Sequence, residues 1–252
     1  MASLSLYVGV IGNIISVLVF LSPAGTFLRI IKHRSTEEFE SLPYVCTLLS
    51  SSLWTYYGLN KSGEILVSTV NGFGILVEAT YVILFLIFAT PSIRAKTAIL
   101  VAILDIGFLA AAILVTRLAL TGDARINAVG YICAGLNIVM YGSPLAAMKT
   151  VVTTKSVEYM PFLLSFFLFL NGGIWTFYAV LVHDFFLGVP NGIGFLLGTG
   201  QLVLYGIYRN TKPSKNSTSE VLEEGWQHER LIDPSSEVHH DKNEAIQERM
   251  CV

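Results

Sequence analysis

Seven long apolar runs constrain the fold of this 252-residue chain more than any other feature of its sequence. They are separated by short polar segments and cover roughly residues 7–28, 43–59, 65–89, 97–116, 126–148, 161–182 and 185–208. A run of about 20 apolar residues can cross a bilayer as a helix, and lipid offers the backbone polar groups no partner outside that helix. The sequence therefore predicts an all-α membrane protein with seven transmembrane helices.

Composition supports this class and argues against several others. Hydrophobic residues make up 53% of the chain and charged residues 13%, whereas a soluble domain carries about 25% charged residues. Cys46, Cys133 and Cys251 form no CxxC pair and no cluster with histidine, so neither a zinc site nor a disulfide framework is expected. The sequence has no basic patch typical of a nucleic-acid binder. It also lacks GxSxG, HExxH and a phosphate-binding glycine loop, so neither an enzyme nor a cofactor is expected.

Basic residues set the expected orientation in the membrane. Ten of them follow the first, third, fifth and seventh runs, namely Arg29, Lys32, Arg34, Arg94, Lys96, Lys149, Lys155, Arg209, Lys212 and Lys215. The loops on the other side hold Lys61, Arg117 and Arg125. Because cytosolic loops carry an excess of Lys and Arg, we expect a cytosolic C-terminus and a lumenal or extracellular N-terminus.

The two halves of the chain repeat each other. In each half, one proline stands near the end of the first run and another opens the second run, which also holds a tryptophan, while an asparagine lies in the third run. These landmarks are Pro23, Pro43, Trp54 and Asn71, and then Pro144, Pro161, Trp175 and Asn191. The first proline precedes the tryptophan by 31 residues in both halves and the asparagine by 48 and 47 residues. An internal repeat of this kind predicts a binding site near the membrane midplane, where the two repeats meet.

The repeat divides the chain into four expected parts. Residues 1–90 form a first three-helix repeat, 91–125 a linker transmembrane helix and 126–209 a second three-helix repeat, which is a 3+1+3 arrangement. Because the linker adds one span between two odd units, both repeats enter the membrane in the same direction. Residues 210–252 are polar and are expected to form a disordered cytosolic tail.

This layout resembles that of the SWEET (MtN3/saliva) family of sugar transporters. The resemblance covers about residues 6–210 and rests on the 3+1+3 order, the four prolines and the segments VSTVNGFG and VPNGIGFLLG. The segment LPYVCTLLSSSLWTYYG is most similar to the plant subgroup often placed on the vacuolar membrane, with the plasma membrane as the alternative. The resemblance implies bidirectional, facilitative transport of a sugar by alternating access, with the lipid bilayer and a second copy of the chain as partners.

Asn71 and Asn191 are the first candidates for contact with the sugar. Pro190-Asn191-Gly192 would usually mark a turn, yet it lies inside an apolar run. A buried amide in lipid needs a partner. From the pattern alone that partner could be a neighbouring helix or a sugar hydroxyl, which donates and accepts as an amide does. The family resemblance implies that the two asparagines bind sugar.

Trp54 and Trp175 are expected to line the same pocket. Core packing or an interfacial belt would also explain a tryptophan in a span, but these two occupy matched positions, and an indole face can stack on the C–H face of a sugar. The resemblance implies that the Trp175 position lines the pocket, whereas the position of Trp54 often holds a smaller residue in the family. Two indoles should narrow the pocket, so the sequence predicts a monosaccharide, fructose or glucose, rather than a disaccharide.

The resemblance also implies two gates. Proline can end or kink a helix, and the family pattern places a proline tetrad at the cytosolic gate and a Tyr and an Asp at the opposite mouth. The implied gating residues are Pro23, Pro43, Pro144, Pro161, Tyr57 and Asp184. Asp184 could equally be an ordinary loop residue. Five tyrosines are interpreted as packing and interfacial residues, namely Tyr81, Tyr131, Tyr141, Tyr178 and Tyr205.

Two acids, Glu78 and Asp105, are the only ones expected inside spans. Intramembrane acids can indicate ion or proton coupling, or Glu78 could bond a neighbouring helix. Neither acid recurs in the other half, and no histidine accompanies them in a span, which favours an uncoupled facilitator. A proton-coupled transporter of the PQ-loop type is an alternative, although Ser-Pro stands where Pro-Gln is expected. A seven-helix receptor is a second alternative function, although the repeats and the short loops argue against it.

Overall fold

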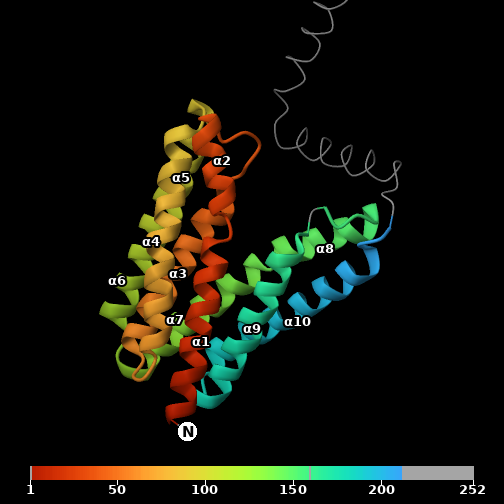
Figure 1. The fold of residues 1–252 in the computed structure, drawn as a ribbon. Helices are drawn as coiled ribbons and strands as arrows, with labels where there is room; N and C mark the ends of the chain where they lie inside the picture. Colours follow the sequence, from red (N-terminus) through yellow and green to blue (C-terminus); the bar gives the residue numbers. More distant parts are fainter. Residues whose placement is uncertain (1, 159, 212–252) are drawn as a thin grey trace, which may run out of the picture. The chain divides into compact units, whose positions relative to one another are not determined.

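The computed structural model describes residues 2–158 and 160–211, and these residues form a series of helices (Figure 1). The helices are α1 (Ala2–Leu21), α2 (Ala24–His33), α3 (Leu42–Asn60), α4 (Ile65–Phe88), α5 (Pro91–Val101), the π-helix η1 (Ala102–Phe108), α6 (Leu109–Ala119), α7 (Gly122–Met140), α8 (Gly142–Thr154), α9 (Phe162–Val182) and α10 (Phe185–Tyr208). The expected tail lies almost entirely outside the described residues. The π-helix, which contains Asp105, was not predicted from the sequence.

Six helical stretches in the described part of the chain are long and apolar enough to cross a membrane. They are Leu4–His33, Ile65–Phe88, Pro91–Ala119, Gly122–Thr154, Phe162–Val182 and Phe185–Tyr208. The helix α3 has 19 residues and no charged residue, but its five Ser and Thr residues make it less apolar than the others. The prediction of an all-helical membrane protein is therefore confirmed, with six candidate spans.

Prolines mark where several helices begin. Pro23 stands immediately before α2, Pro43 lies in the first turn of α3, and Pro161 immediately precedes α9. These positions suit proline, because the first turn of a helix does not use its backbone N–H groups. A further break at Tyr141 separates α7 from α8, three residues before Pro144.

Pro190 is different, because it lies inside α10 and the segment VPNGIG is helical rather than a turn. Proline has no N–H for the carbonyl one turn earlier, which weakens the helix there. The Tyr141 hydroxyl donates a hydrogen bond to the carbonyl of Pro190, and a Cβ on Gly194 would lie only 2.8 Å from that hydroxyl. At the equivalent place in the first half, a Cβ on Gly74 would lie 2.5 Å from the ring of Phe20.

The chain divides into two compact units. Unit 1 comprises residues 1–145 and 161–203, and unit 2 comprises residues 146–160 and 204–252. In the described part of unit 2, the Lys155 ammonium lies 3.3 Å from the Tyr208 hydroxyl. All residues of the cavity described below belong to unit 1.

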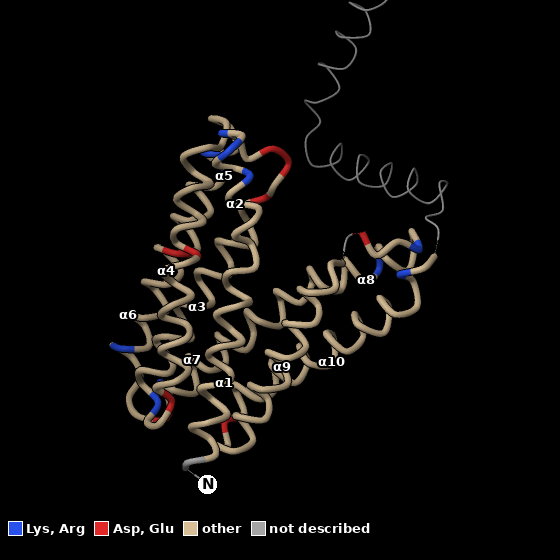
Figure 2. The backbone as a smooth tube through the Cα atoms, viewed as in Figure 1, with Lys and Arg blue, Asp and Glu red and all other residues tan. Residues whose placement is uncertain are grey.

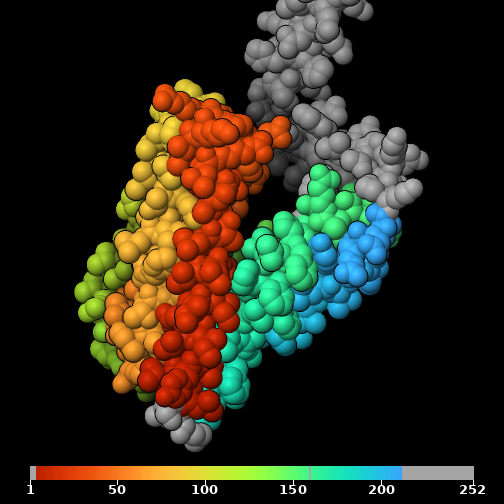
Figure 3. All heavy atoms as spheres, in the orientation of Figure 1, coloured from red at the N-terminus to blue at the C-terminus, as the bar shows by residue number. Residues whose placement is uncertain are grey.

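Within unit 1 the two halves of the chain are packed into each other. The helix α1 contacts both α4 and α9, and α3 contacts both α4 and α7. Figure 3 shows the atoms of α1 and α9 in contact in the lower half of the view. The first helix of each half therefore packs on the second helix of the other half. Charged residues in unit 1 gather mainly at the ends of the helices (Figure 2), as expected for a bundle in lipid.

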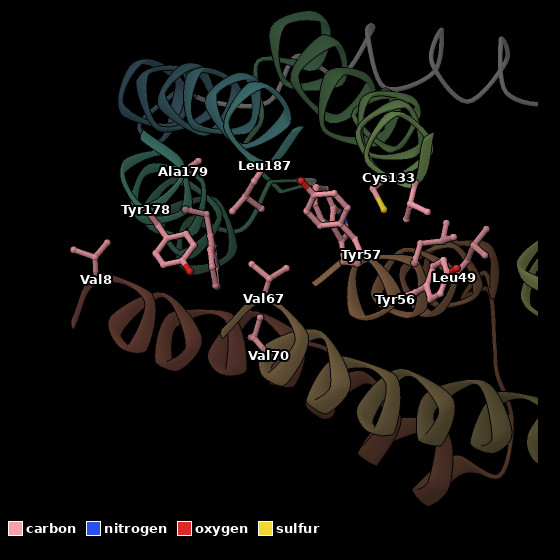
Figure 4. Close-up of a cluster of buried hydrophobic side chains, with 14 residues drawn as sticks. Val8, Leu49, Tyr56, Tyr57, Val67, Val70, Cys133, Tyr178, Ala179 and Leu187 are labelled. Atoms are coloured by element: carbon pink, nitrogen blue, oxygen red, sulfur yellow. The ribbon is translucent and has the colours of Figure 1, made fainter. Parts of the chain in front are cut away.

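The core of unit 1 lies where these helices meet, and Figure 4 shows its buried side chains. Tyr57 is fully buried, and Trp54, Trp175 and Tyr178 are at most 5% exposed. The aromatic contacts repeat in the two halves. Trp54 meets Tyr57 edge-on at 5.3 Å between ring centroids, and Trp175 meets Tyr178 edge-on at the same distance. The internal repeat seen in the sequence is therefore also a repeat of side-chain packing.

Candidate functional site

Unit 1 holds a cavity of about 180 Å³. Its walls come from α1, α3, α4, α7, α9 and α10. The four residues predicted to contact substrate, Asn71, Asn191, Trp54 and Trp175, all line it. Residues more than 100 positions apart in the sequence therefore converge on one space.

Asn71 and Asn191 present the same chemical group to the cavity. The Nδ2 of Asn71 donates to the Val67 carbonyl at 2.8 Å, and the Nδ2 of Asn191 donates to the Leu187 carbonyl at 2.8 Å. Each amide thus uses its N–H group on its own helix, one turn back. Among the described residues neither Oδ1 atom accepts a hydrogen bond. Both oxygens are therefore available to accept from a hydroxyl.

A second pair of asparagines, Asn137 and Asn171, also lines the cavity. The Oδ1 of Asn137 accepts from the Ser50 hydroxyl at 3.0 Å, and the Oδ1 of Asn171 accepts from the Ser16 hydroxyl at 2.6 Å. These amides have their oxygens occupied, so their Nδ2 groups remain as donors. The sequence analysis missed this pair. The sequence carries the same signal for this pair as for Asn71 and Asn191, because each of these four residues is an amide inside an apolar run.

The two tryptophans are held by this polar network. The Nε1 of Trp175 donates to the Ser16 hydroxyl at 2.8 Å, and the Nε1 of Trp54 lies 3.5 Å from the Oδ1 of Asn137. Each indole N–H therefore donates its hydrogen bond to a residue in the other half of the chain. A buried indole N–H needs such a partner, so the network fixes how far both rings extend into the cavity.

Tyr57 and Asp184, predicted to lie near the outer mouth, are brought together. The Tyr57 hydroxyl lies 3.0 and 2.9 Å from the two carboxylate oxygens of Asp184. The Lys61 ammonium lies 2.7 Å from Asp184 Oδ2 and 3.1 Å from the Tyr57 hydroxyl. Asp184 is only 2% exposed, and its carboxylate accepts the Leu187 N–H at 3.1 Å. It is a buried, fully bonded residue rather than a free loop side chain.

The four prolines lie at helix starts or breaks rather than in the core. Pro23 and Pro144 are half-buried, and Pro43 and Pro161 are exposed. None of them lines the cavity.

The two intramembrane acids also lie outside the cavity. Glu78 is 3% exposed. Among the described residues its Oε2 and both carboxylate oxygens of Asp105 have no hydrogen-bond partner. The alternative that Glu78 bonds a neighbouring helix is therefore not supported for that oxygen.

The sequence matches one family model twice. The model is described as "Sugar efflux transporter for intercellular exchange", and it matches residues 6–92 and residues 127–213. The two matches correspond to the two repeats found in the sequence, and they leave the linker between them.

Similar proteins are also described as sugar transporters. The chain is 63% identical over 227 residues to "Bidirectional sugar transporter SWEET17" from Arabidopsis thaliana, which covers 89% of this chain and 94% of that protein. It is 63% identical over 215 residues to "Bidirectional sugar transporter SWEET16" from the same plant, over 84% of this chain and 93% of that protein. These relatives are transporters and not enzymes, as expected.

A solved structure, "The 3.7 A resolution structure of a eukaryotic SWEET transporter", has a TM-score of 0.79 and 38% identity, and covers 82% of this chain and 97% of that one. The fold, the repeated motifs and the two matches to the family model agree with one another. The chain therefore belongs to the SWEET (MtN3/saliva) family of sugar transporters.

Proposed function

We propose that this protein is a bidirectional, uncoupled transporter of a monosaccharide, glucose or fructose, and that the sugar binds in the cavity of unit 1. The observation that carries this proposal is the pattern of free hydrogen-bonding groups. Asn71 and Asn191 offer acceptors, while Asn137 and Asn171 offer donors. A sugar hydroxyl both donates and accepts, so a ring of such groups matches a polyol better than an ion or an apolar solute.

The size of the cavity supports a small sugar. Pockets for drug-sized ligands measure roughly 300–1,000 Å³, whereas this cavity measures about 180 Å³. Trp54 and Trp175 occupy two of its walls. The indole faces can stack on the C–H faces of a sugar ring while the amides meet its hydroxyls. A disaccharide would require these walls to move apart.

The transport step is proposed to be alternating access. In this structure Tyr57, Lys61 and Asp184 are joined at one end of unit 1. We infer a seven-span, 3+1+3 arrangement in which the two repeats, residues 1–90 and 126–209, rock against each other about the cavity. The helix breaks at Pro23 and next to Pro144 are the proposed bending points. The double match to the family model supports the two repeats.

The proposed membrane is that of the vacuole, with the C-terminus in the cytosol. The vacuolar placement rests on the family resemblance of the LPYVCTLLSSSLWTYYG segment, and the orientation on the bias of Lys and Arg toward one set of loops.

The test is uptake of radiolabelled glucose, fructose and sucrose into proteoliposomes by wild type and by Asn191→Ala. We expect saturable hexose uptake by wild type. We expect a loss of about tenfold or more in the variant, because the site then lacks a partner for a sugar hydroxyl. Asn13→Ala is the matched control. Asn13 bonds the Gly9 and Leu66 carbonyls at 3.0 and 3.1 Å and does not line the cavity. Normal uptake by Asn191→Ala would contradict the proposed site.

A further inference from the structure

The helix α10 lacks one of its own hydrogen bonds directly beside Asn191. Pro190 has no N–H to donate to the carbonyl one turn earlier, so the helix is weakened at this point. The equivalent residue in the first half is Val70, which stands directly before Asn71 and has an ordinary N–H. Of the two asparagines proposed to bind sugar, Asn191 therefore lies on the weaker stretch of helix.

Tyr141 reaches this stretch from another helix. It stands at the C-terminal end of α7, and its hydroxyl donates a hydrogen bond to the Pro190 carbonyl. The same hydroxyl would lie 2.8 Å from a Cβ on Gly194, one turn further along α10. The tyrosine therefore contacts α10 within the helical turn that carries Asn191.

The internal repeat provides a comparison for this hydroxyl. Phe20 and Tyr141 each lie three residues before the first proline of their half, and Gly74 and Gly194 each lie three residues after its asparagine. A Cβ on Gly74 would lie 2.5 Å from the Phe20 ring, so an aromatic ring faces the equivalent glycine in both halves. The second half adds a hydroxyl to that ring, and it also has the proline before its asparagine. The hydroxyl thus occurs in the half whose helix lacks a bond of its own.

The same turn of α10 also packs closely on α9. A Cβ on Gly172 would lie 2.7 Å from the backbone nitrogen of Phe195 and 3.1 Å from the carbonyl oxygen of Asn191. Steric contact of this kind opposes only a closer approach of the two helices. A hydrogen bond is directional and resists displacement away from its partner as well, so the bond from Tyr141 is a second and different constraint on this turn.

We propose that Tyr141 is a positioning residue of the sugar site. Its hydroxyl holds the α10 backbone at Pro190 and thereby holds the Asn191 amide where its Oδ1 can accept from a sugar hydroxyl. Tyr141 does not line the cavity, so it acts through the helix rather than by contact with the sugar. The proposal rests on the proposed function, since it assumes that Asn191 bonds the sugar.

Loss of this bond should weaken sugar binding more than it slows transport. Without the bond, α10 adopts several positions at Asn191, and only a fraction of the molecules then present the amide correctly. The apparent affinity falls in proportion to that fraction. At saturating sugar the bound molecule itself holds the amide, so the maximal rate should change little.

The test measures glucose uptake into proteoliposomes over a range of concentrations, which separates KM from the maximal rate. Tyr141→Phe keeps the ring and removes only the hydroxyl. We expect its KM for glucose to rise about three- to tenfold, which corresponds to the net contribution of one neutral hydrogen bond, with a maximal rate close to that of wild type. Tyr131→Phe is the matched control and should follow wild type, because Tyr131 lies on the same helix with a side chain that is 68% exposed.

Gly194→Ala disturbs the same bond without altering Tyr141. The added Cβ would lie 2.8 Å from the tyrosine hydroxyl, and the end of the side chain can tilt away while the helix backbone stays in place. We expect the same rise in KM. Gly192→Ala is the matched control, since a Cβ there meets its nearest neighbour, Thr176, at 3.9 Å.

The double variant that combines Tyr141→Phe with Gly194→Ala tests whether the two changes act on one bond. Its KM should be no higher than that of either single variant, because a bond can be lost only once. Two independent structural effects would add as free energies, so the increases in KM would multiply.

A wild-type KM in Tyr141→Phe would overturn the proposal, and so would increases that multiply in the double variant. Less folded protein or a lower maximal rate with an unchanged KM would show that Tyr141 supports only the fold. If Tyr141→Phe yields no folded protein, a wild-type KM in Gly194→Ala is sufficient to contradict the proposal.

These outcomes differ from failure of the proposed function, in which wild type shows no saturable hexose uptake or Asn191→Ala retains normal uptake. If Asn191→Ala loses uptake while Tyr141→Phe keeps the wild-type KM, the sugar site stands and only the role of Tyr141 is wrong.

Discussion

Trp54 is the residue at which the size of the cavity can be changed with least disturbance to the amides. Its ring lines the cavity, is 4% exposed, and packs edge-on against Tyr57. Its hydrogen bond to Asn137 is long, at 3.5 Å, whereas Trp175 is bonded to Ser16 at 2.8 Å. Trp54 is therefore the less firmly held of the two indoles, and its bulk is its main contribution to the cavity wall.

We expect Trp54→Leu to raise the ratio of sucrose uptake to glucose uptake, because the shorter side chain leaves room for a second sugar ring. Trp54→Phe retains a ring and should keep the wild-type ratio. The measurement is competition between the two labelled sugars in proteoliposomes. Because truncating a buried tryptophan costs several kcal/mol, about 3–5 for a change to alanine, the amount of folded protein is measured alongside. Sucrose exclusion by a folded Trp54→Leu that still carries glucose would mean that Trp54 does not set the size limit.

Among the helices, α9 and α10 make a close backbone approach that bears on the site. A Cβ on Gly172 would lie 2.7 Å from the backbone nitrogen of Phe195 and 3.1 Å from the carbonyl oxygen of Asn191. Both of these are backbone atoms, so no rotation of a side chain could make room. Small residues allow this kind of approach between membrane helices. Gly172 thereby fixes the distance between the helix that carries Trp175 and the helix that carries Asn191.

Gly172→Ala is expected to destabilise the protein by about 1–3 kcal/mol, the usual cost of overpacking. Gly135→Ala is the matched control, because a Cβ at Gly135 meets no atom within 4 Å and alanine is the better helix former. The measurement is the thermal midpoint of the purified protein in detergent. Equal midpoints for the two variants would mean that α9 and α10 can move apart at no cost.

At the level of the whole molecule, the placement of the acids bears on energy coupling. Glu78 and Asp105 do not line the cavity, and neither do Glu64 and Asp184. No described carboxylate therefore lines the space in which the sugar is proposed to bind.

We therefore expect that an imposed proton gradient does not concentrate sugar. At long times the internal concentration of labelled glucose in proteoliposomes should equal the external concentration, with or without the gradient. Accumulation above the external concentration that disappears with a protonophore would contradict an uncoupled mechanism and favour the proton-coupled alternative.

The sequence alone determined the features that follow from local chemistry and from repetition. Apolar runs become helices in lipid because the backbone must bond to itself, so Phe185–Tyr208 is helical even through Pro190. The equal spacing in the two halves identified Asn71, Asn191, Trp54 and Trp175, and all four line the cavity.

Only the tertiary structure decided which polar groups face one another. Hydrogen-bond partners depend on how helices far apart in sequence are rotated, and no local pattern fixes that rotation. The occupied oxygens of Asn137 and Asn171 depend on serines from the other half of the chain. The pairing of Asp184 with Tyr57 likewise required the two repeats to be packed into each other. The sequence could show that the chain carries two matched sets of polar residues, but which of their atoms remain free to bond was decided by the packing between the two halves.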